Sequence, residues 1–265
     1  MTQNTGSTLS SADATSVVCP ARSMSPGTWR SAFNPAAIDV IRRSTASSPP
    51  PVSSPLLRSN PFPDMETWSH LDDVLDLVWR EIEAGASNSD HFFRTPTFAT
   101  AGANQPQLRT VILRTAQREA RMLSFHSDRR SAKVSEIQSN GRIAWHAWNP
   151  ERSLQLRLRG SATVHTTDRV ADSMWESEPP ASLGHYLKPE SPATVINEPD
   201  DGLPNELHAG DLTSEDVAPG RPHFAVIRTV IDDIDPLHLQ RRHHQRVIFR
   251  WNQSDKTFEG SWLNP

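Results

Sequence analysis

The stretch LQLRLR, residues 154–159, places a leucine at every second position. Successive side chains of a β-strand point to opposite faces, so this alternation predicts a strand with one apolar and one polar face. The two faces would consist of Leu154, Leu156 and Leu158 on one side and of Gln155, Arg157 and Arg159 on the other. The simplest meaning of the polar row is the solvent side of a barrel strand.

Several other runs are rich in β-forming residues. They occupy residues 91–102, 105–115, 122–127, 142–148, 224–234, 237–239, 245–251 and 258–263. The first two are separated by a Gly/Asn/Pro turn at 102–106, the pattern of a hairpin. Many short strands with few helices predict a mainly β fold, a β-barrel with flanking helices on its outside.

Three helices are predicted beside these strands. Apolar residues recur at helical spacing from about Glu66 to Ala84, and Gly85 can serve as the stop. A short helix follows residue 130, where Ser131 can cap the start. Residues 168–177 predict a third helix with an apolar inner face.

Two segments differ in composition from the rest. Residues 1–64 are rich in Ser, Thr, Ala and Pro, which predicts a disordered N-terminal segment. Translation starting at Met65 is an alternative, and either way residues 65–265 form the folded domain. Residues 179–222 are rich in Pro, Gly and acidic residues and predict a long irregular excursion, a kind of loop that is often functional.

Charge and cysteine content exclude several classes of function. The net charge of −4 gives no global field for nucleic acid or for an anionic membrane. The single cysteine, Cys19, rules out an intramolecular disulfide or a multi-cysteine metal site. We find no apolar run of membrane-spanning length and no secretory signal, and we expect a cytoplasmic protein.

A local anion site is nevertheless possible around the stretch FHSDRRSAK, residues 125–133. A phosphate prefers convergent guanidinium, ammonium and hydroxyl donors at a helix start. Arg109, Ser127, Ser131 and Lys133 could supply all of these if the strands pair as predicted. The alternative is that these basic residues are solvated surface charges, and the residue pattern alone leaves both readings open.

The sequence gives little indication of a metal site or of a catalytic site that works without a cofactor. In RRHHQR, residues 241–246, the adjacent histidines would point to opposite faces of a strand, so we expect no metal. Neither a nucleophile elbow nor a dinucleotide fingerprint is present. A bound cofactor would then supply the reactivity of any enzyme built on this chain.

The motifs taken in order resemble the pyridoxamine 5'-phosphate oxidase family of FMN-binding split barrels. RTVILR, residues 109–114, is similar to the first flavin-contacting strand of that family, and FHSDRRSAK to its phosphate-gripping turn. RRHHQR is similar to its Arg-x-His-x-Arg signature, and SWLNP to its C-terminal ending. The resemblance spans roughly residues 66–265 and is greatest to a divergent, cyanobacterial-type FMN-binding branch.

This resemblance implies a homodimer that binds FMN between its subunits. The cofactor contacts it implies are Arg109, Thr110, Val111, Ile112, Ser127, Ser131, Lys133, Gln155 and Arg246. The resemblance implies that Arg109 and Lys133 hold the phosphate together with Ser127 and Ser131. Ile112 and the neighbouring backbone would line the flavin ring, and Gln155 and Arg246 would lie beside it. Candidate substrate contacts are Arg114, Arg242 and His244.

The chain also departs from the family pattern. Ala132 stands where the family commonly has an arginine, with Arg130 as a candidate replacement, and Glu178 stands where the true oxidase has a substrate-binding arginine. We therefore expect an FMN-dependent oxidoreductase of unassigned substrate. The alternatives are a vitamin B6 oxidase acting on pyridoxamine or pyridoxine 5'-phosphate, and a non-catalytic carrier or sensor of flavin or haem.

Overall fold

The computed structural model describes residues 67–199, 203, 212–240 and 243–265. The predicted disordered segment 1–64, the alternative start at Met65 and the candidate substrate contact Arg242 lie outside the described residues. In the described part, no helix is both long and apolar enough to cross a membrane.

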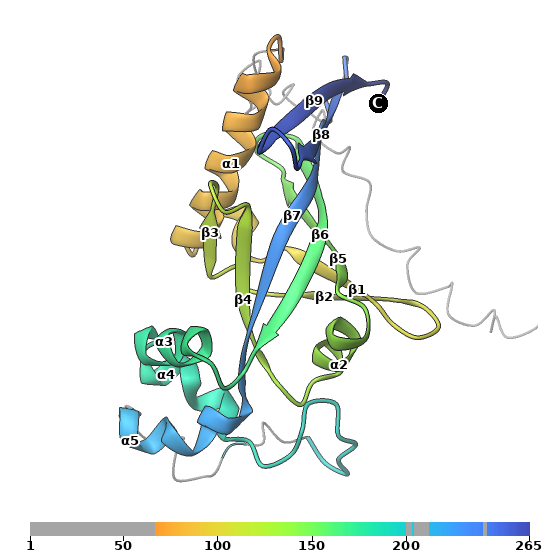
Figure 1. The fold of residues 1–265 in the computed structure, drawn as a ribbon. Coiled ribbons are helices and arrows are strands. Elements are labelled where there is room, and N and C mark those ends of the chain that lie inside the picture. Colours follow the sequence, from red (N-terminus) through yellow and green to blue (C-terminus); the bar gives the residue numbers. More distant parts are fainter. Residues whose placement is uncertain (1–66, 200–202, 204–211, 241–242) are drawn as a thin grey trace, which may run out of the picture. The chain divides into compact units, whose positions relative to one another are not determined.

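In the part of the chain that the structure describes, nine antiparallel strands form one sheet (Figure 1). They are β1 (Thr97–Ala101), β2 (Pro106–Thr110), β3 (Thr115–Gln117), β4 (Met122–Asp128), β5 (Arg142–Asn149), β6 (Leu154–His165), β7 (Phe224–His238), β8 (Gln245–Asn252) and β9 (Thr257–Leu263). Their order is β2-β1-β5-β6-β7-β4-β3, and β8 and β9 continue from β7. The sheet is open, as in a split barrel, and the predicted hairpin is the β1–β2 pair.

The alternating strand that most constrained the fold is β6. Leu154, Leu156 and Leu158 are buried, as predicted from their spacing. β6 pairs with both β5 and β7, which makes it central to the sheet. The register with β7 shifts at Gly160, where a Cβ atom would lie 1.9 Å from the carbonyl oxygen of Val230. Only glycine fits this bulge without displacing backbone.

The main core lies between this sheet and α1 (Leu71–Ser87). Val78, Trp79 and Ile82 of α1 are at most 2% exposed. The predicted stop at Gly85 is wrong, because the helix continues through this residue to Ser87. A Cβ atom at Gly85 would lie 2.7 Å from Phe93, so this glycine permits close packing instead of ending the helix.

The segment 179–222 is irregular only in part: residues 188–199 form neither helix nor strand, as its composition predicts, but residues 180–187 and 214–223 form short helical turns. Its described parts contain α4 (Pro180–Leu183), α5 (Ser214–Val217) and the 3-10 helices η3 (Gly184–Leu187) and η5 (Ala218–His223). With α3 (Arg169–Ser177), they surround a second core cluster centred on Phe224. Prolines at helix starts and a capping box at Thr213 explain how polar sequence forms these short turns.

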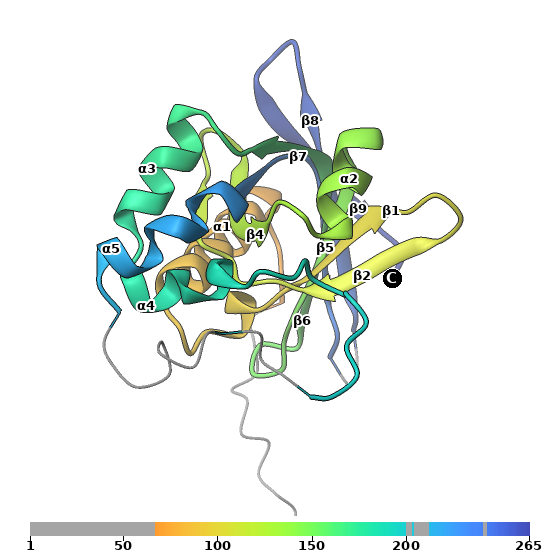
Figure 2. The ribbon, with the colours of Figure 1, turned by 90° about the horizontal axis from the view of Figure 1, so that it is seen from below.

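The remaining helix, α2 (Ala132–Ser139), begins directly after β4. The two views place α2 on one side of β4 and α3 and α4 on the other (Figure 1, Figure 2). The end of β4 therefore lies between two groups of helices. This is the position of FHSDRRSAK, whose strand-to-helix change the sequence predicts.

Candidate functional site

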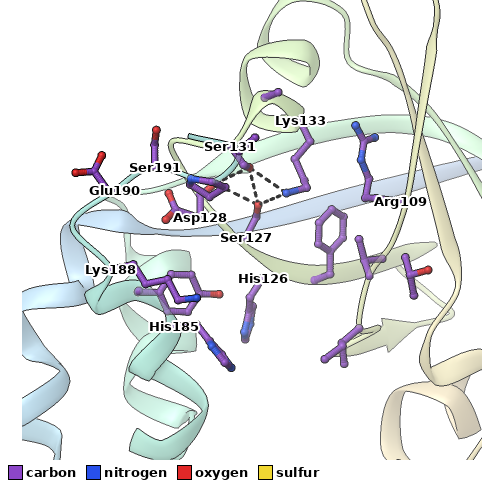
Figure 3. Close-up of a pocket in the computed structure, with 18 of the residues that line it drawn as sticks. Arg109, His126, Ser127, Asp128, Ser131, Lys133, His185, Lys188, Glu190 and Ser191 are labelled. Carbon is purple, nitrogen blue, oxygen red and sulfur yellow. Dashed lines mark hydrogen bonds between the residues drawn. The ribbon is translucent and has the colours of Figure 1, made fainter. Parts of the chain in front are cut away.

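A cavity of about 840 Å³ lies at the end of β4 (Figure 3). Its walls come from three parts of the chain: the end of β2 with the link that follows it, the turn from β4 into α2, and the segment from α4 to residue 196. Such a volume is typical of small-molecule and cofactor sites. Residues far apart in sequence thus line one space.

One end of this cavity presents a cluster of hydrogen-bond donors, which we call the anion end: Ser127, Ser131 and Lys133. The ammonium Nζ of Lys133 lies 3.1 Å from Ser127 Oγ and 3.0 Å from Ser131 Oγ, as the dashed lines in Figure 3 show. Both serines are buried. Ser131 occupies the N-cap position of α2 but makes no side-chain capping bond; its hydroxyl lies 3.1 Å from Ser127 Oγ and donates to Asp128 O at 2.7 Å.

The charge of Lys133 is not neutralised by an ion pair with any described residue. Burial, and then the nearby Arg109, lower its pKa from the ordinary value. A half-buried ammonium with two neutral oxygen partners at a helix start is a favourable place for an anion. The first N–H groups of α2 have no partner within the helix and can add further donors. This donor set fits a phosphate monoester.

Arg109 reaches the same cavity from β2, as predicted, but it is engaged elsewhere. Its Nη2 lies 3.0 Å from Glu136 Oε2, and its Nη1 donates to Thr100 Oγ1 at 2.5 Å. Thr100 Oγ1 in turn donates to the same carboxylate oxygen. The guanidinium is therefore held between β1 and α2.

Arg130 does not replace the arginine missing at Ala132. Its guanidinium binds both carboxylate oxygens of Asp128 and donates to the carbonyl oxygens of Lys188 and Pro189, each at 2.9 Å. The hydrogen bond to Asp128 raises the pKa of Arg130. Through these hydrogen bonds, Arg130 links the segment after η3 to the β4–α2 turn and stabilises this wall of the cavity.

The predicted ring-lining residues, Thr110, Val111 and Ile112, also line the cavity. β2 ends at Thr110, and the following residues leave the ladder, where Val111 N donates to Pro96 O at 3.0 Å. The Ile112 side chain is 46% exposed. An apolar side chain open to a polar cavity offers a surface for a planar ring.

Arg114 and His126 both line the cavity, and Glu178, which does not line it, contacts both of them. Arg114 Nη1 is 3.2 Å from one carboxylate oxygen of Glu178, and His126 Nδ1 is 3.7 Å from the other. Burial, followed by the charge of Arg114, lowers the pKa of His126 to about 4, so the imidazole is neutral at pH 7. Its Nε2 is buried and has no hydrogen-bond partner among the described residues.

Gln155 and Arg246 do not line this cavity in one chain. Gln155 faces Trp148 on β5 and Leu237 on β7 in the ladder. Arg246 binds Asp235 at 3.0 Å and lines a separate hollow of about 360 Å³ over β5, β6 and β8. The remaining candidate, His244, is exposed and lines neither hollow.

Sequence reasoning missed a group of cavity residues contributed by the segment from α4 to residue 196. They are Ser182, His185, Tyr186, Lys188, Glu190, Ser191 and Ile196. Burial raises the pKa of Tyr186, so its phenol stays neutral. The composition of this segment gave no signal for these positions, because only its packing brings them to β4. The described residues contain no group of His, Cys, Asp or Glu arranged to hold a metal ion.

Comparison with protein families agrees with this geometry. The family model described as pyridoxamine 5'-phosphate oxidase, FMN-binding domain, matches residues 76–166, which include the anion end. This part of the chain is therefore similar to the FMN-binding domain of pyridoxamine 5'-phosphate oxidase. The matched domain binds FMN, and a donor set suited to a phosphate monoester is what this cofactor requires. Comparison with curated proteins gives no match.

Two solved structures share the fold. A pyridoxamine 5'-phosphate oxidase-related, FMN-binding protein from Nostoc punctiforme is 20% identical, with a TM-score of 0.54, and the match covers 72% of this chain and 96% of that one. PhzG from Burkholderia lata, in complex with tetrahydrophenazine-1-carboxylic acid, is 15% identical, with a TM-score of 0.56, covering 76% and 98%. At these identities the likeness establishes the split-barrel fold.

Proposed function

We propose that this protein is an FMN-dependent oxidoreductase that acts on a small organic substrate as a homodimer. The observation that carries the proposal is the donor cluster of Lys133, Ser127 and Ser131 at one end of a cavity large enough for a flavin. Bound FMN would supply the redox chemistry by accepting and returning two electrons as a hydride equivalent. The chain itself would supply binding, orientation and a defined charge around the ring.

The anion end would hold the FMN phosphate. Lys133 would contribute the charge-assisted bond, and the two serine hydroxyls would contribute further donors. Thr110, Val111 and Ile112 would support the ring side of the cofactor. The segment attached by Arg130 would exclude bulk water from one side of the cavity, because it contributes the wall from residue 188 onward.

The positions of Gln155 and Arg246 support the proposed homodimer. The family resemblance assigns both to the flavin ring, yet in one chain they lie outside the cavity that contains the anion end. A second copy could bring its own Gln155 and Arg246 to this cavity. Large apolar side chains are also exposed, including Leu108 at 66% and Trp262 at 45%, and such side chains favour burial in a subunit interface.

The part of the cavity around Arg114, which we call the substrate end, argues against a phosphate ester as the substrate. Arg114 is paired with Glu178, so its charge is already balanced before any substrate binds. A phosphorylated substrate would have to compete with this carboxylate and would meet its negative charge nearby. Vitamin B6 phosphates are therefore poor candidates, and an uncharged or weakly charged substrate is favoured.

The purified full chain tests the proposal through its absorbance spectrum and through FMN titration. We expect a flavin band, its bleaching under anaerobic conditions by a reducing substrate from a compound panel, and a dimer in light scattering. Exchange of Arg109 and Lys133 together for alanine should abolish tight FMN binding. A protein that does not bind added FMN, or a flavin that no reductant in the panel bleaches, would refute the proposed activity.

A further inference from the structure

Two arginines near the anion end, Arg109 and Arg130, are each matched by a carboxylate, whereas the exposed Arg129 makes no ion pair with a described residue and does not line the cavity. Arg109 is paired with Glu136 at 3.0 Å, and Arg130 is paired with Asp128 at 2.7 Å. Lys133 makes no ion pair with a described residue. Within the anion end itself, the positive charge that no ion pair balances is that of Lys133.

Glu136 stands out among these carboxylates because of where it lies. It is on α2, one turn after Lys133, and so belongs to the helix whose start faces the anion end. Its side chain is only 16% exposed, and its Oε2 receives bonds from both Arg109 and Thr100. Thr100 is 3% exposed, so the three side chains form a largely enclosed and mutually satisfied network.

We propose that Glu136 determines how tightly this chain holds FMN, by neutralising Arg109 and keeping its guanidinium against β1. This rests on the proposed placement of the FMN phosphate at the anion end. The negative charge of Glu136 opposes the phosphate dianion and occupies the donors that Arg109 would otherwise offer. The cofactor is therefore held less tightly than the number of basic residues indicates, and it exchanges faster.

The side chains near Lys133 support this direction. After burial, Arg109 lowers the pKa of Lys133, whereas Asp128 and then Glu136 raise it, so Glu136 and Arg109 both interact electrostatically with this lysine. In a partly buried site, and after screening by salt, one charge near a phosphate dianion changes the affinity of the site for that dianion by about tenfold. Most of that change should appear in the dissociation rate.

The isosteric variant Glu136→Gln tests the proposal because it removes the charge and keeps an oxygen that can accept from Arg109. We expect it to bind FMN about tenfold more tightly than the parent chain and to release it correspondingly more slowly. Riboflavin has the same ring and no phosphate, so its affinity should not change. The difference should shrink in high salt, because the effect is electrostatic.

Two comparisons make the result specific. Glu83→Gln removes the same charge from an exposed position on α1 and should leave FMN binding unchanged. Thermal melting of the apo chains checks that Glu136→Gln still folds. If FMN affinity is unchanged or lower in Glu136→Gln, or if riboflavin affinity rises in parallel, the role of Glu136 is refuted while FMN binding stands. If the parent chain binds no FMN, both the placement of the phosphate and the role of Glu136 are refuted.

Discussion

Replacement of Lys133 by alanine should weaken FMN binding much more than riboflavin binding. A charge-assisted hydrogen bond to an anion contributes about 1.5–3 kcal/mol. Since about 1.4 kcal/mol corresponds to tenfold in Kd, we expect the Kd for FMN to rise about 10- to 150-fold. Riboflavin lacks the phosphate and should keep its affinity within about threefold.

The same change should have little effect on the fold. The two partners of Lys133, Ser127 and Ser131, are 3.1 Å apart and can hydrogen-bond each other without it. Ser131 Oγ also donates to Asp128 O at 2.7 Å. We therefore expect the free energy of unfolding to change by no more than about 0.5 kcal/mol, as for other substitutions that remove no core contact.

Flavin fluorescence titration of the apo chain provides the assay. Arg129→Ala is a matched control, since it removes one positive charge from an exposed side chain four residues earlier in the same turn. Lys133→Arg keeps the charge and should recover part of the affinity. An unchanged Kd for FMN in Lys133→Ala, or an equal loss for riboflavin, would refute the assignment of the phosphate to this lysine.

Other properties can be tested separately. Because the pKa of His126 is about 4 in the folded chain and 6.5 when unperturbed, the unfolded chain binds more protons between these values. In urea titrations, the free energy of unfolding should reach its full value above about pH 6.5 and should decrease as the pH falls toward 4. His126→Gln should weaken this dependence on pH. Gly160→Ala places a Cβ atom against Val230 O and should lower stability by about 3 kcal/mol or more, or prevent folding, which thermal melting would detect. Glu178→Gln frees Arg114 from its ion pair and should increase the affinity for pyridoxine 5'-phosphate, which the parent chain should not oxidise. Calorimetry would measure this affinity. If the variant binds no more tightly than the parent chain, the charge of Arg114 is not what Glu178 balances against a phosphate ester.

Much of the fold follows from local patterns in the sequence. The alternation at Leu154, Leu156 and Leu158 defines β6 because a strand has a period of two and one face is buried. The strand-to-helix change at Ser131 is predicted from capping preferences and from the helical spacing after it; Ser131 is at the N-cap position, although its side chain makes no capping bond, and Val134 and Ile137 are buried. These signals are contained in a few neighbouring residues, so they can be read without the tertiary structure.

The features that sequence did not predict depend on contacts between distant segments. Gly85 looked like a helix stop, but its role is set by Phe93 packing against it. Arg130 looked like a phosphate ligand, but carbonyl groups of residues 188 and 189 and Asp128 bind it instead. Glu136 gave no signal of its own, because its partner Arg109 is 27 residues away and on another element.

The structure of the chain crystallised with FMN would test the central claim most directly. We expect the phosphate within hydrogen-bond distance of Lys133 Nζ and of the Ser127 and Ser131 hydroxyls, with the ring beside residues 110–112. Gln155 and Arg246 of a second copy should approach the ring. A phosphate bound elsewhere, for example in the hollow that Arg157 and Arg246 line, would contradict the site described for this chain.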